Sequence, residues 1–457
     1  MTEQLVEKFT EIVGVKNALT DADAMAPHLI EWRGTWTGRT PVVLKPRSTA
    51  EVAAILKLAQ ETRTAVVPQG GNTGLVGAQI PDGSGHQIVI STGRMNTVRA
   101  LDTKGRTLIV DAGVTLQNAR DAAENADLLF PLSLASQGTS QIGGNIASNA
   151  GGLGALAYGV ARDLVLGLEV VLPGGRVLED LSVLKKDNTG YALRHLFIGS
   201  EGTLGIITAT SLKLFPKPKG HATMFAVLET PDAALELLNL AQSRAGNQLT
   251  AFELMADEVT SMAVKHVNGV RRPLEKSTGW TVLTEVSSLR SQDDSEAVMA
   301  EIAESALQNG IIADGAIAQS QSQRAEMWRL REALSEAQKP EGISIKHDIS
   351  VPVHQIPAFI VEAGKAAAHI VPDMRFCTFG HMGDGNLHYN ISQPPGVSAD
   401  AFRVKSGDVT KAVHDVVRKM DGSISAEHGI GQMKRDELAA TKSPVAMHLM
   451  RSIKSAF

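Results

Sequence analysis

Three glycine-rich segments limit what this chain can fold into more than any other feature of its sequence. They are PQGGNTGLVGA (68–78), QIGGNIASNAGG (141–152) and SEGTLGIIT (200–208). The chain has 42 glycines, whereas average usage of roughly 7% would give about 32. Glycine among serine, threonine and asparagine lets backbone N–H groups approach an anion closely. Because all three segments fall in one region, they predict loops that hold a phosphate-bearing ligand rather than three unrelated turns.

Two common nucleotide-binding motifs do not account for these loops. The P-loop pattern GxxxxGK[ST] does not occur in the sequence. Residues 152–157 (GLGALA) match a loose GxGxxA pattern, but they follow SNAG (148–151) instead of a hydrophobic strand. A dinucleotide-binding Rossmann unit requires strand, turn and helix in that order, so we reject it here.

Short strands mixed with helices predict an α+β fold rather than a regular βαβ alternation. We expect helix over residues 2–31, a strand in PVVLKP (41–46), and a helix in EVAAILKLAQ (51–60) that Thr49 caps.

The segment FPKPKG (215–220) marks a domain boundary, because two prolines and a glycine follow a strand-like run. We therefore expect one domain over 1–218. A second α+β domain with long amphipathic helices is expected over 219–417, and a mostly helical segment over 418–457.

Composition limits the partners and the setting. A net charge of -5 implies no basic face, so we expect no nucleic-acid partner. No run reaches the ~18 apolar residues of a membrane span, and the acidic start of the sequence is not typical of a signal or transit peptide. The single cysteine, Cys377, excludes an intrachain disulfide and an all-cysteine iron–sulfur cluster. A reduced, cytoplasmic setting is expected, and a homodimer is an assembly that the sequence allows.

The strongest chemical signal lies in FCTFGHMGDGNLHYNIS (376–392). His381 and His388 flank the turn-forming residues GDGN (383–386), which disfavour a helix. Because strand-like runs flank this turn, we expect a hairpin whose two strands bring the histidines to facing ends. His388 and Asn390 are two residues apart, so they share a face of the second strand.

A second cluster lies in SAEHGIG (425–431). Glu427 and His428 are consecutive, and Gly429 and Gly431 allow a turn that brings both side chains to one site. Two histidines and one carboxylate form a three-ligand metal site with open positions for a substrate. Zn²⁺ suits this set, and so do Mn²⁺ and Fe²⁺.

Cationic side chains between these clusters suit an acidic substrate. Trp328, Arg331 and Ser335 fall on one face of a predicted helix, and the planar guanidinium of Arg331 can bind a carboxylate. In ISIKHDISVPV (343–353), Lys346 lies on the polar face of a predicted strand. A surface salt bridge or a solvated strand face is the alternative for each residue taken alone.

Taken together, these motifs resemble the vanillyl-alcohol oxidase / p-cresol methylhydroxylase flavoprotein family over nearly the whole chain. The resemblance implies a two-lobed FAD-binding domain, with the FAD pyrophosphate on the 68–78 loop and the flavin ring at the domain interface. It implies that the segment 418–457 packs back near the FAD. Some members bind the flavin covalently through a histidine where this sequence has Asn72, so the resemblance implies non-covalent FAD here.

The same resemblance assigns roles to individual residues. The FAD contacts that it implies are Pro68, Gly70, Gly71, Asn72, Thr73, Gly74, Gly77, Ser136, Gly138, Gly143, Gly144, Ser148, Asn149, Gly152, Glu201, Gly202, Gly205 and Ile206. The histidine and carboxylate motifs are similar to the metal-containing branch of the family, which includes D-2-hydroxyglutarate and D-lactate dehydrogenases. There the ligands match His381, His388 and Glu427, the base matches His428, and the substrate residues match Arg331, Ser335, Lys346, Asn390 and His428.

The resemblance implies oxidation of a small D-2-hydroxy acid to the 2-keto acid with FAD and one divalent metal. Zn²⁺ is the expected metal, and Mn²⁺ and Fe²⁺ are the alternatives. Arginine plus lysine suits a diacid such as D-2-hydroxyglutarate, with D-malate a further substrate. Because no iron–sulfur relay is possible, electrons should leave to an electron-transfer flavoprotein or a quinone-linked acceptor. The alternatives are a D-lactate or glycolate dehydrogenase of the same branch, a metal-dependent hydrolase without flavin, and a non-catalytic flavin-binding subunit. Family members continue into a further tail, whereas this sequence ends at IKSAF.

Overall fold

The computed structural model describes residues 1–275 and 279–457, which divide into two compact units. The first unit comprises Met1–Gly151, Gly159–Lys217 and His428–Phe457, and the second comprises Gly152–Tyr158 and Pro218–Glu427. The chain leaves the first unit within FPKPKG, the segment expected to mark a boundary. The division differs from the expected one in two places, because residues 152–158 and 418–427 group with the second unit.

The first unit begins with a four-stranded sheet in the order β1-β2-β4-β3. Its strands are β1 (Ala18–Leu19), β2 (Val43–Leu44), β3 (Val66–Gln69) and β4 (Ile88–Ser91), with helices α1 (Glu3–Val13), α2 (Ala22–Leu29) and α3 (Thr49–Glu61) around them. The expected helix over 2–31 is wrong in its middle, because Gly14 ends α1 with a φ of 81° and Asp21 caps the start of α2. Ser48, not Thr49, caps α3, since its side chain accepts a hydrogen bond from the Glu51 amide.

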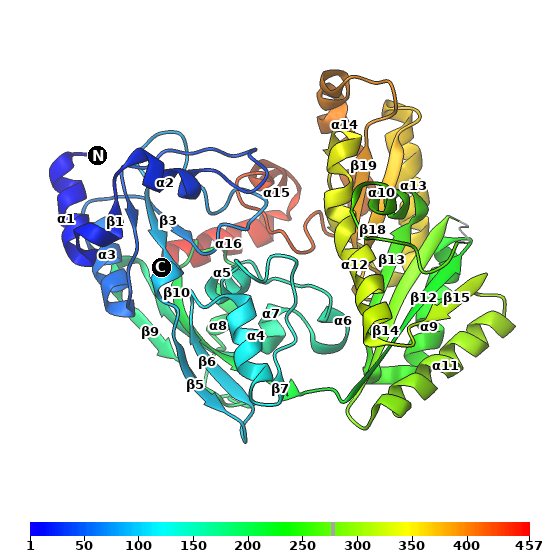
Figure 1. Cartoon of the computed structure of the whole chain (residues 1–457). Coiled ribbons are helices and arrows are strands. Elements are labelled where there is room, and N and C mark those ends of the chain that lie inside the picture. The colour runs from blue at the N-terminus through cyan, green and yellow to red at the C-terminus, as the bar shows by residue number, and fades with distance from the viewer. Residues whose placement is uncertain (276–278) are drawn as a thin grey trace. The chain divides into compact units, whose positions relative to one another are not determined.

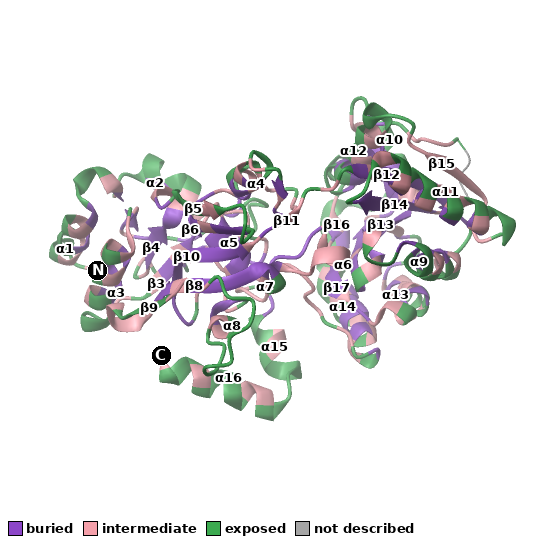
Figure 2. Cartoon of the chain, turned by 90° about the horizontal axis from the view of Figure 1, so that it is seen from below, coloured by how far each residue is buried: buried purple, intermediate pink, exposed green. Residues whose placement is uncertain are grey.

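A second, five-stranded antiparallel sheet completes the two lobes of this unit. Its order is β5-β6-β10-β8-β9, and Figure 2 shows its central strands β8 and β10 as buried. The strands are β5 (Val98–Asp102), β6 (Thr107–Asp111), β8 (Val165–Val171), β9 (Val177–Asp180) and β10 (Ile206–Lys213). A small pair joins β7 (Leu128–Leu129) to β11 (Phe215–Pro216). The helices are α4 (Leu116–Glu124), α5 (Ile142–Ala147), α7 (Ala161–Leu164) and α8 (Arg194–Phe197).

The C-terminal helices α15 (Arg435–Thr441) and α16 (Pro444–Ala456) belong to the first unit. The ring of Phe457 lies 5.5 Å from that of Phe197, and the Lys454 ammonium donates to the Thr203 carbonyl at 2.5 Å. Most of α16 is exposed (Figure 2).

The second unit is built on an eight-stranded antiparallel sheet in the order β15-β12-β14-β13-β18-β19-β16, with β17 also paired to β19 (Figure 1). The strands are β12 (Gly220–Leu228), β13 (Leu249–Ala256), β14 (Trp280–Ser288), β15 (Asp314–Ile317), β16 (Ser344–Ile345), β17 (Asp348–Ser350), β18 (Arg375–His381) and β19 (Asn386–Ser392). Its helices are α6 (Ala155–Tyr158), α9 (Pro231–Ala245), α10 (Asp257–His266), α11 (Gln292–Gln308), α12 (Gln321–Ala337), α13 (Ile356–Ile370) and α14 (Ala399–Lys419).

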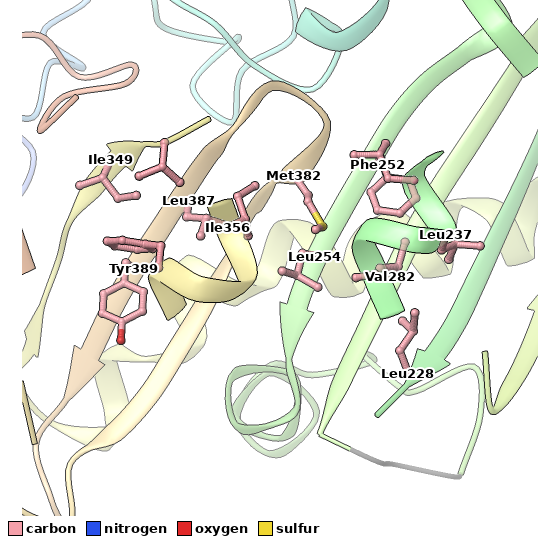
Figure 3. Packing of buried hydrophobic residues seen from close by; sticks show 14 of the residues in the cluster. Leu228, Leu237, Phe252, Leu254, Val282, Ile349, Ile356, Met382, Leu387 and Tyr389 are labelled. Atoms are coloured by element: carbon pink, nitrogen blue, oxygen red, sulfur yellow. The ribbon is translucent and has the colours of Figure 1, made fainter. Parts of the chain in front are cut away.

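Helices cover both faces of this sheet. On one face, side chains such as Leu254, Leu387 and Tyr389 form a large core with residues of α9, α11, α13 and α14 (Figure 3). On the other face, Met255, Cys377 and Phe379 pack with residues of α10 and α12. The alternation follows from the two-residue period of a strand, and it places the polar residues discussed below on the α10 and α12 face.

The long helices begin where the sequence provides caps. Thr230, Ser291, Ser320 and Ser398 each accept a hydrogen bond from a backbone amide in the first turn of α9, α11, α12 and α14. Within residues 1–275 and 279–457, the structure has no helix whose length and apolar character would let it cross a membrane.

Candidate functional site

The residues 375–392 form the expected hairpin, with β18 and β19 paired in antiparallel register. Phe379 lies opposite His388, and His388 lies opposite Asp348 of β17. In the neighbouring strand β13, Glu253 lies opposite His381. Since opposed residues share a face of the sheet, these side chains all lie on the face covered by α10 and α12.

The carboxylate of Glu253 holds two of the expected site residues. Its Oε1 atom lies 2.7 Å from Nδ1 of His381, and its Oε2 atom accepts hydrogen bonds from Arg331 of α12. Burial would raise the pKa of the Glu253 carboxyl, but the charges of His381 and Arg331 lower it to about 2. Burial likewise opposes protonation of His381, but the charge and hydrogen bond of Glu253 raise its pKa to about 9. Glu253 is therefore a fixed negative charge inside the sheet face.

Glu427 stands between the two histidines. Its carboxylate oxygens lie 3.8 Å from Nε2 of His381 and 3.9 Å from Nε2 of His388. Burial raises the pKa of Glu427 to about 7. A cation placed among these three groups would stabilise the charged form of Glu427 and displace a proton from His381.

The two distances to Glu427 suit a divalent metal between this carboxylate and each histidine. Ligand atoms around a tetrahedral ion lie roughly 3.4 Å apart when the metal–ligand distances are about 2.1 Å, close to the distances to Glu427. The carboxylate of Glu253 on the other nitrogen of His381 is the partner that metal-binding histidines commonly have.

Asp348 offers a competing ligand. Its carboxylate, His388 and Glu427 can place ligand atoms within 4.8 Å of one another. However, the oxygens of Asp348 already accept hydrogen bonds from the Asn386 amide at 3.0 Å and the Glu427 backbone N–H at 2.8 Å. The carboxylate of Asp348 therefore holds the backbone of Glu427 in place.

Arg331 is the expected substrate residue that lies nearest this cluster. Its guanidinium stacks over the Phe379 ring at 4.9 Å from the centroid, and its Nε and Nη2 atoms bind Glu253. Among the described contacts, Nη1 has none, so one edge of the guanidinium can bind a substrate carboxylate.

The other expected substrate residues are more dispersed. Ser335 is exposed one turn further along α12, because the buried side of this helix is centred on Leu330 and Leu334. Asn390 is buried, and its amide donates to Gln338 at 3.2 Å.

Lys346 lies between β16 and β17, so the strand expected over 343–353 is not continuous. The register on both sides of the break is the same and places Lys346 opposite Asn390. At the break, the ring Nδ1 atom of His347 lies 2.7 Å from the carbonyl oxygen of Tyr389.

The glycines of the three segments have two different environments in the first unit. A side chain on Gly71 would meet the carbonyl of Thr139 at 1.9 Å, and one on Gly143 would meet Ala112 at 2.6 Å. Close packing of the chain on itself therefore requires these glycines. Side chains on Gly74, Gly77, Gly202 and Gly205 would meet Gln79, Trp36, Pro68 and Val170 at 3.0 Å or less.

By contrast, Gly144 and Gly138, which lies just before the second segment, face open space: beyond their chain neighbours and the backbone of their own helix, no atom of the described residues lies within 4 Å of an added Cβ. Nearby, side-chain atoms of Gln137, Ser140 and Asn145 are buried without a hydrogen-bond partner among the described residues. Buried polar atoms are nearly always paired, so these atoms await a ligand or ordered water. This combination of open glycines and orphaned polar atoms fits a bound FAD.

Several other expected FAD residues have their side chains engaged within the first unit. Asn72 has a φ of 54°, and its amide donates to the carbonyls of Pro27 and Ile30 at 2.9 Å. Asn149 accepts from the Arg162 amide at 3.0 Å, and the Ser148 hydroxyl donates to the Gly144 carbonyl at 3.1 Å.

The remaining expected contacts are placed by their elements. Pro68 lies in β3 and Ile206 begins β10. Gly70, Thr73 and Ser136 lie in loops, and Gly152 groups with the second unit.

Glu201 connects two of the motifs. Its carboxylate accepts hydrogen bonds from the backbone amides of Ile430 and Gly431 at 2.7 and 2.8 Å. It therefore fixes the turn that follows His428, the expected base, within the first unit.

Known proteins provide an independent comparison. Residues 217–457 match the family described as FAD linked oxidases, C-terminal domain, and residues 40–180 match the FAD binding domain. The chain belongs to the FAD-linked oxidase family. The prediction of a flavoprotein is confirmed, and a hydrolase without flavin is excluded.

Individual relatives cover nearly all of the chain. A D-2-hydroxyglutarate dehydrogenase of Arabidopsis thaliana, named as mitochondrial, is 37% identical over 98% of this chain and 78% of its own length. A D-2-hydroxyglutarate dehydrogenase of Xanthomonas citri pv. viticola is 36% identical over 99% of this chain and 94% of its own. A p-cresol methylhydroxylase structure with substrate bound aligns with a TM-score of 0.74 at 17% identity, covering 99% and 94% of the two chains. It confirms the expected α+β fold.

Sequence reasoning missed Glu253 and Asp348. Glu253 is the single charge in the apolar strand LTAFELMA (249–256), and a lone buried charge is a signal of a specific partner. Asp348 was recognised only as part of a polar strand face, and its contact with Glu427 joins residues 79 apart in the sequence.

Proposed function

We propose that this protein is a dehydrogenase that oxidises D-2-hydroxyglutarate to 2-oxoglutarate with non-covalent FAD and one divalent metal. The observation that carries the proposal is the pair His381 and His388 around the carboxylate of Glu427, in a chain of an FAD-linked family. The substrate is inferred from relatives of that name at 36–37% identity.

His381, His388 and Glu427 would hold the metal, with Zn²⁺ the first candidate because two imidazoles and a carboxylate suit it. When bound, the metal supplies a Lewis acid that lowers the pKa of the substrate hydroxyl, and FAD supplies the acceptor for a hydride. His428 would take the hydroxyl proton as general base, since the chain ties it directly to the ligand Glu427.

The remaining residues would orient the acid groups. Arg331 would bind one carboxylate through Nη1, and Lys346 with Asn390, its opposite residue in the register, would bind the other. A diacid has a carboxylate for each of the two cations, whereas D-lactate and glycolate have a single carboxylate and would bind to only one of them. Reoxidation requires an external acceptor such as an electron-transfer flavoprotein or a quinone-linked carrier, because one cysteine cannot hold an iron–sulfur relay.

The test is a substrate panel with the FAD-loaded protein under anaerobic conditions. D-2-hydroxyglutarate should bleach the visible flavin band fastest, followed by D-malate, and L-2-hydroxyglutarate serves as the stereochemical control. Faster bleaching by D-lactate or glycolate would transfer the assignment to a monocarboxylic acid. No bleaching by any D-acid would contradict the proposed activity.

A further inference from the structure

Glu253 lies in the middle of β13 with 1% of its surface exposed. One carboxylate oxygen contacts Nδ1 of His381 and the other contacts Nε and Nη2 of Arg331, all at 2.7 Å. The first partner is an expected metal ligand and the second an expected substrate residue. One side chain therefore touches both halves of the proposed site.

The contact with Glu253 determines which nitrogen of His381 is available to a metal. A carboxylate oxygen accepts hydrogen bonds, so at a separation of 2.7 Å Nδ1 of His381 carries the hydrogen. The lone pair that can bind a metal is then on Nε2, the atom that lies 3.8 Å from Glu427. A metal-binding histidine commonly has such an acceptor on its second nitrogen, and the acceptor strengthens the bond to the metal.

We propose that Glu253 is a positioning residue that holds the metal ligand His381 and the substrate-binding Arg331 in one geometry. Loss of its negative carboxylate would then weaken metal binding and substrate binding together. This inference rests on the proposed function, but its main readout, metal affinity, does not depend on which acid is the substrate.

The alternative is that Glu253 only stabilises the fold as a buried ion pair. The same sheet provides a matched control in Glu285 of the neighbouring strand β14, which is 6% exposed. Glu285 also binds an arginine of α12, with Nε and Nη2 of Arg324 at 2.8 and 2.9 Å, and it accepts from Trp328 at 2.8 Å. It contacts none of the proposed metal ligands within the described contacts, so it separates loss of a buried ion pair from loss of a positioned ligand.

The experiment compares Glu253→Gln with Glu285→Gln in the full-length, FAD-loaded protein. Glutamine has the shape of glutamate, but an NH2 donor replaces one of the two oxygens, so it cannot accept from both His381 and Arg331 in their present positions. Zn²⁺ affinity is measured by competition with a chromophoric chelator. Glu253→Gln should weaken Zn²⁺ binding by about 10–100-fold, whereas Glu285→Gln should stay within about threefold of wild type, a change below ~0.7 kcal/mol.

Two further readouts keep the outcomes apart. The FAD content of both variants should equal that of wild type, and at saturating Zn²⁺ Glu253→Gln should still raise KM for D-2-hydroxyglutarate through Arg331. If Glu253→Gln does not fold, Glu253→Asp decides, because the shorter side chain keeps the charge but cannot reach both partners. Wild-type Zn²⁺ affinity in a folded Glu253 variant, or an equal loss in Glu285→Gln, overturns the inference. A wild-type protein that binds no divalent metal would instead overturn the metal site of the proposed function, and this inference with it.

Discussion

The two units use opposite means to prepare a ligand site. In the first, Gly138 and Gly144 leave open space beside buried polar atoms that have no partner among the described residues. In the second, other residues hold the expected metal ligands in position: Glu253 contacts the ring of His381, and Asp348 accepts a hydrogen bond from the backbone of Glu427. The first site depends on glycines, which have no side chain to fill the space, and the second depends on side chains held in position by their neighbours. Adding a side chain should therefore damage the first, and removing one should damage the second.

The largest expected effect is loss of a metal ligand. His388→Ala should lower the rate of D-2-hydroxyglutarate oxidation by at least about 10³-fold, because a Lewis acid contributes several kcal/mol to the transition state. FAD content should not change, because the open glycines and unpaired polar atoms that fit FAD lie in the first unit and do not include His388. The measurement is turnover with an artificial electron acceptor, and the control is His369→Ala, which removes an exposed histidine of α13. A variant that retains wild-type turnover would remove His388 from the ligand set.

Filling the open space of the first unit should have the next largest effect. Gly144 is an exposed helical residue of α5, so Gly144→Leu should leave the apoprotein at least as stable, because leucine favours helix over glycine. FAD affinity should fall by about tenfold or more, equivalent to ~1.4 kcal/mol. Gly407→Leu is the matched control, since Gly407 is also helical and faces open space but lies in α14 of the second unit. Titration of the apoprotein with FAD measures the FAD affinity of both variants. Unchanged affinity in Gly144→Leu would contradict the proposal that FAD occupies the open space at Gly144.

A smaller effect is expected at Glu201, whose carboxylate holds the turn that follows His428. Glu201→Gln retains one acceptor oxygen and loses the other, so one of the amides of Ile430 and Gly431 loses its partner. We expect kcat to fall by about tenfold through a looser His428, equivalent to ~1.4 kcal/mol, with Zn²⁺ affinity and FAD content unchanged. Steady-state kinetics and FAD content are the measurements. Loss of FAD would show that the carboxylate serves the cofactor instead.

The smallest effect on turnover is expected at Glu285, whose substitution should change the stability of the fold and the dependence of that stability on pH. Burial would raise the pKa of Glu285, but hydrogen bonds from His221 and Arg324 lower it to about 2. Its folded pKa is below its unfolded value near 4.3, so its stabilisation is present at neutral pH and is lost as the pH falls from about 4.3 towards 2. The contribution is on the order of 1–3 kcal/mol.

Glu285→Gln should therefore be less stable at neutral pH, and its stability should depend less on pH in that window. Acid titration followed by tryptophan fluorescence measures this dependence, and Trp328 contacts the residue directly. Identical acid curves for the variant and wild type would contradict the assigned pKa.

Local patterns in the sequence were enough to predict the hairpin and the presence of long helices in the second domain. A glycine turn between two alternating runs determines the pairing of β18 with β19. The contact of Glu253 with His381 could not be predicted in this way, because the two residues are 128 positions apart and meet only through the pairing of β13 with β18.

The glycine segments were also only partly understood from sequence. A glycine can leave room for a ligand or for the chain itself, and the sequence does not separate the two. The structure shows that Gly71 and Gly143 serve the packing of the chain, whereas Gly138 and Gly144 are open.

We propose that oxidation by this protein needs both FAD and a divalent metal ion. The most direct test is anaerobic reduction of the chelator-treated protein by D-2-hydroxyglutarate. We expect the chelator-treated protein to stay yellow, because its flavin is not reduced. One equivalent of Zn²⁺ or another divalent metal should restore bleaching of the flavin band. Full-rate bleaching of protein shown to be metal-free would contradict the account and leave His381, His388 and Glu427 without their proposed role.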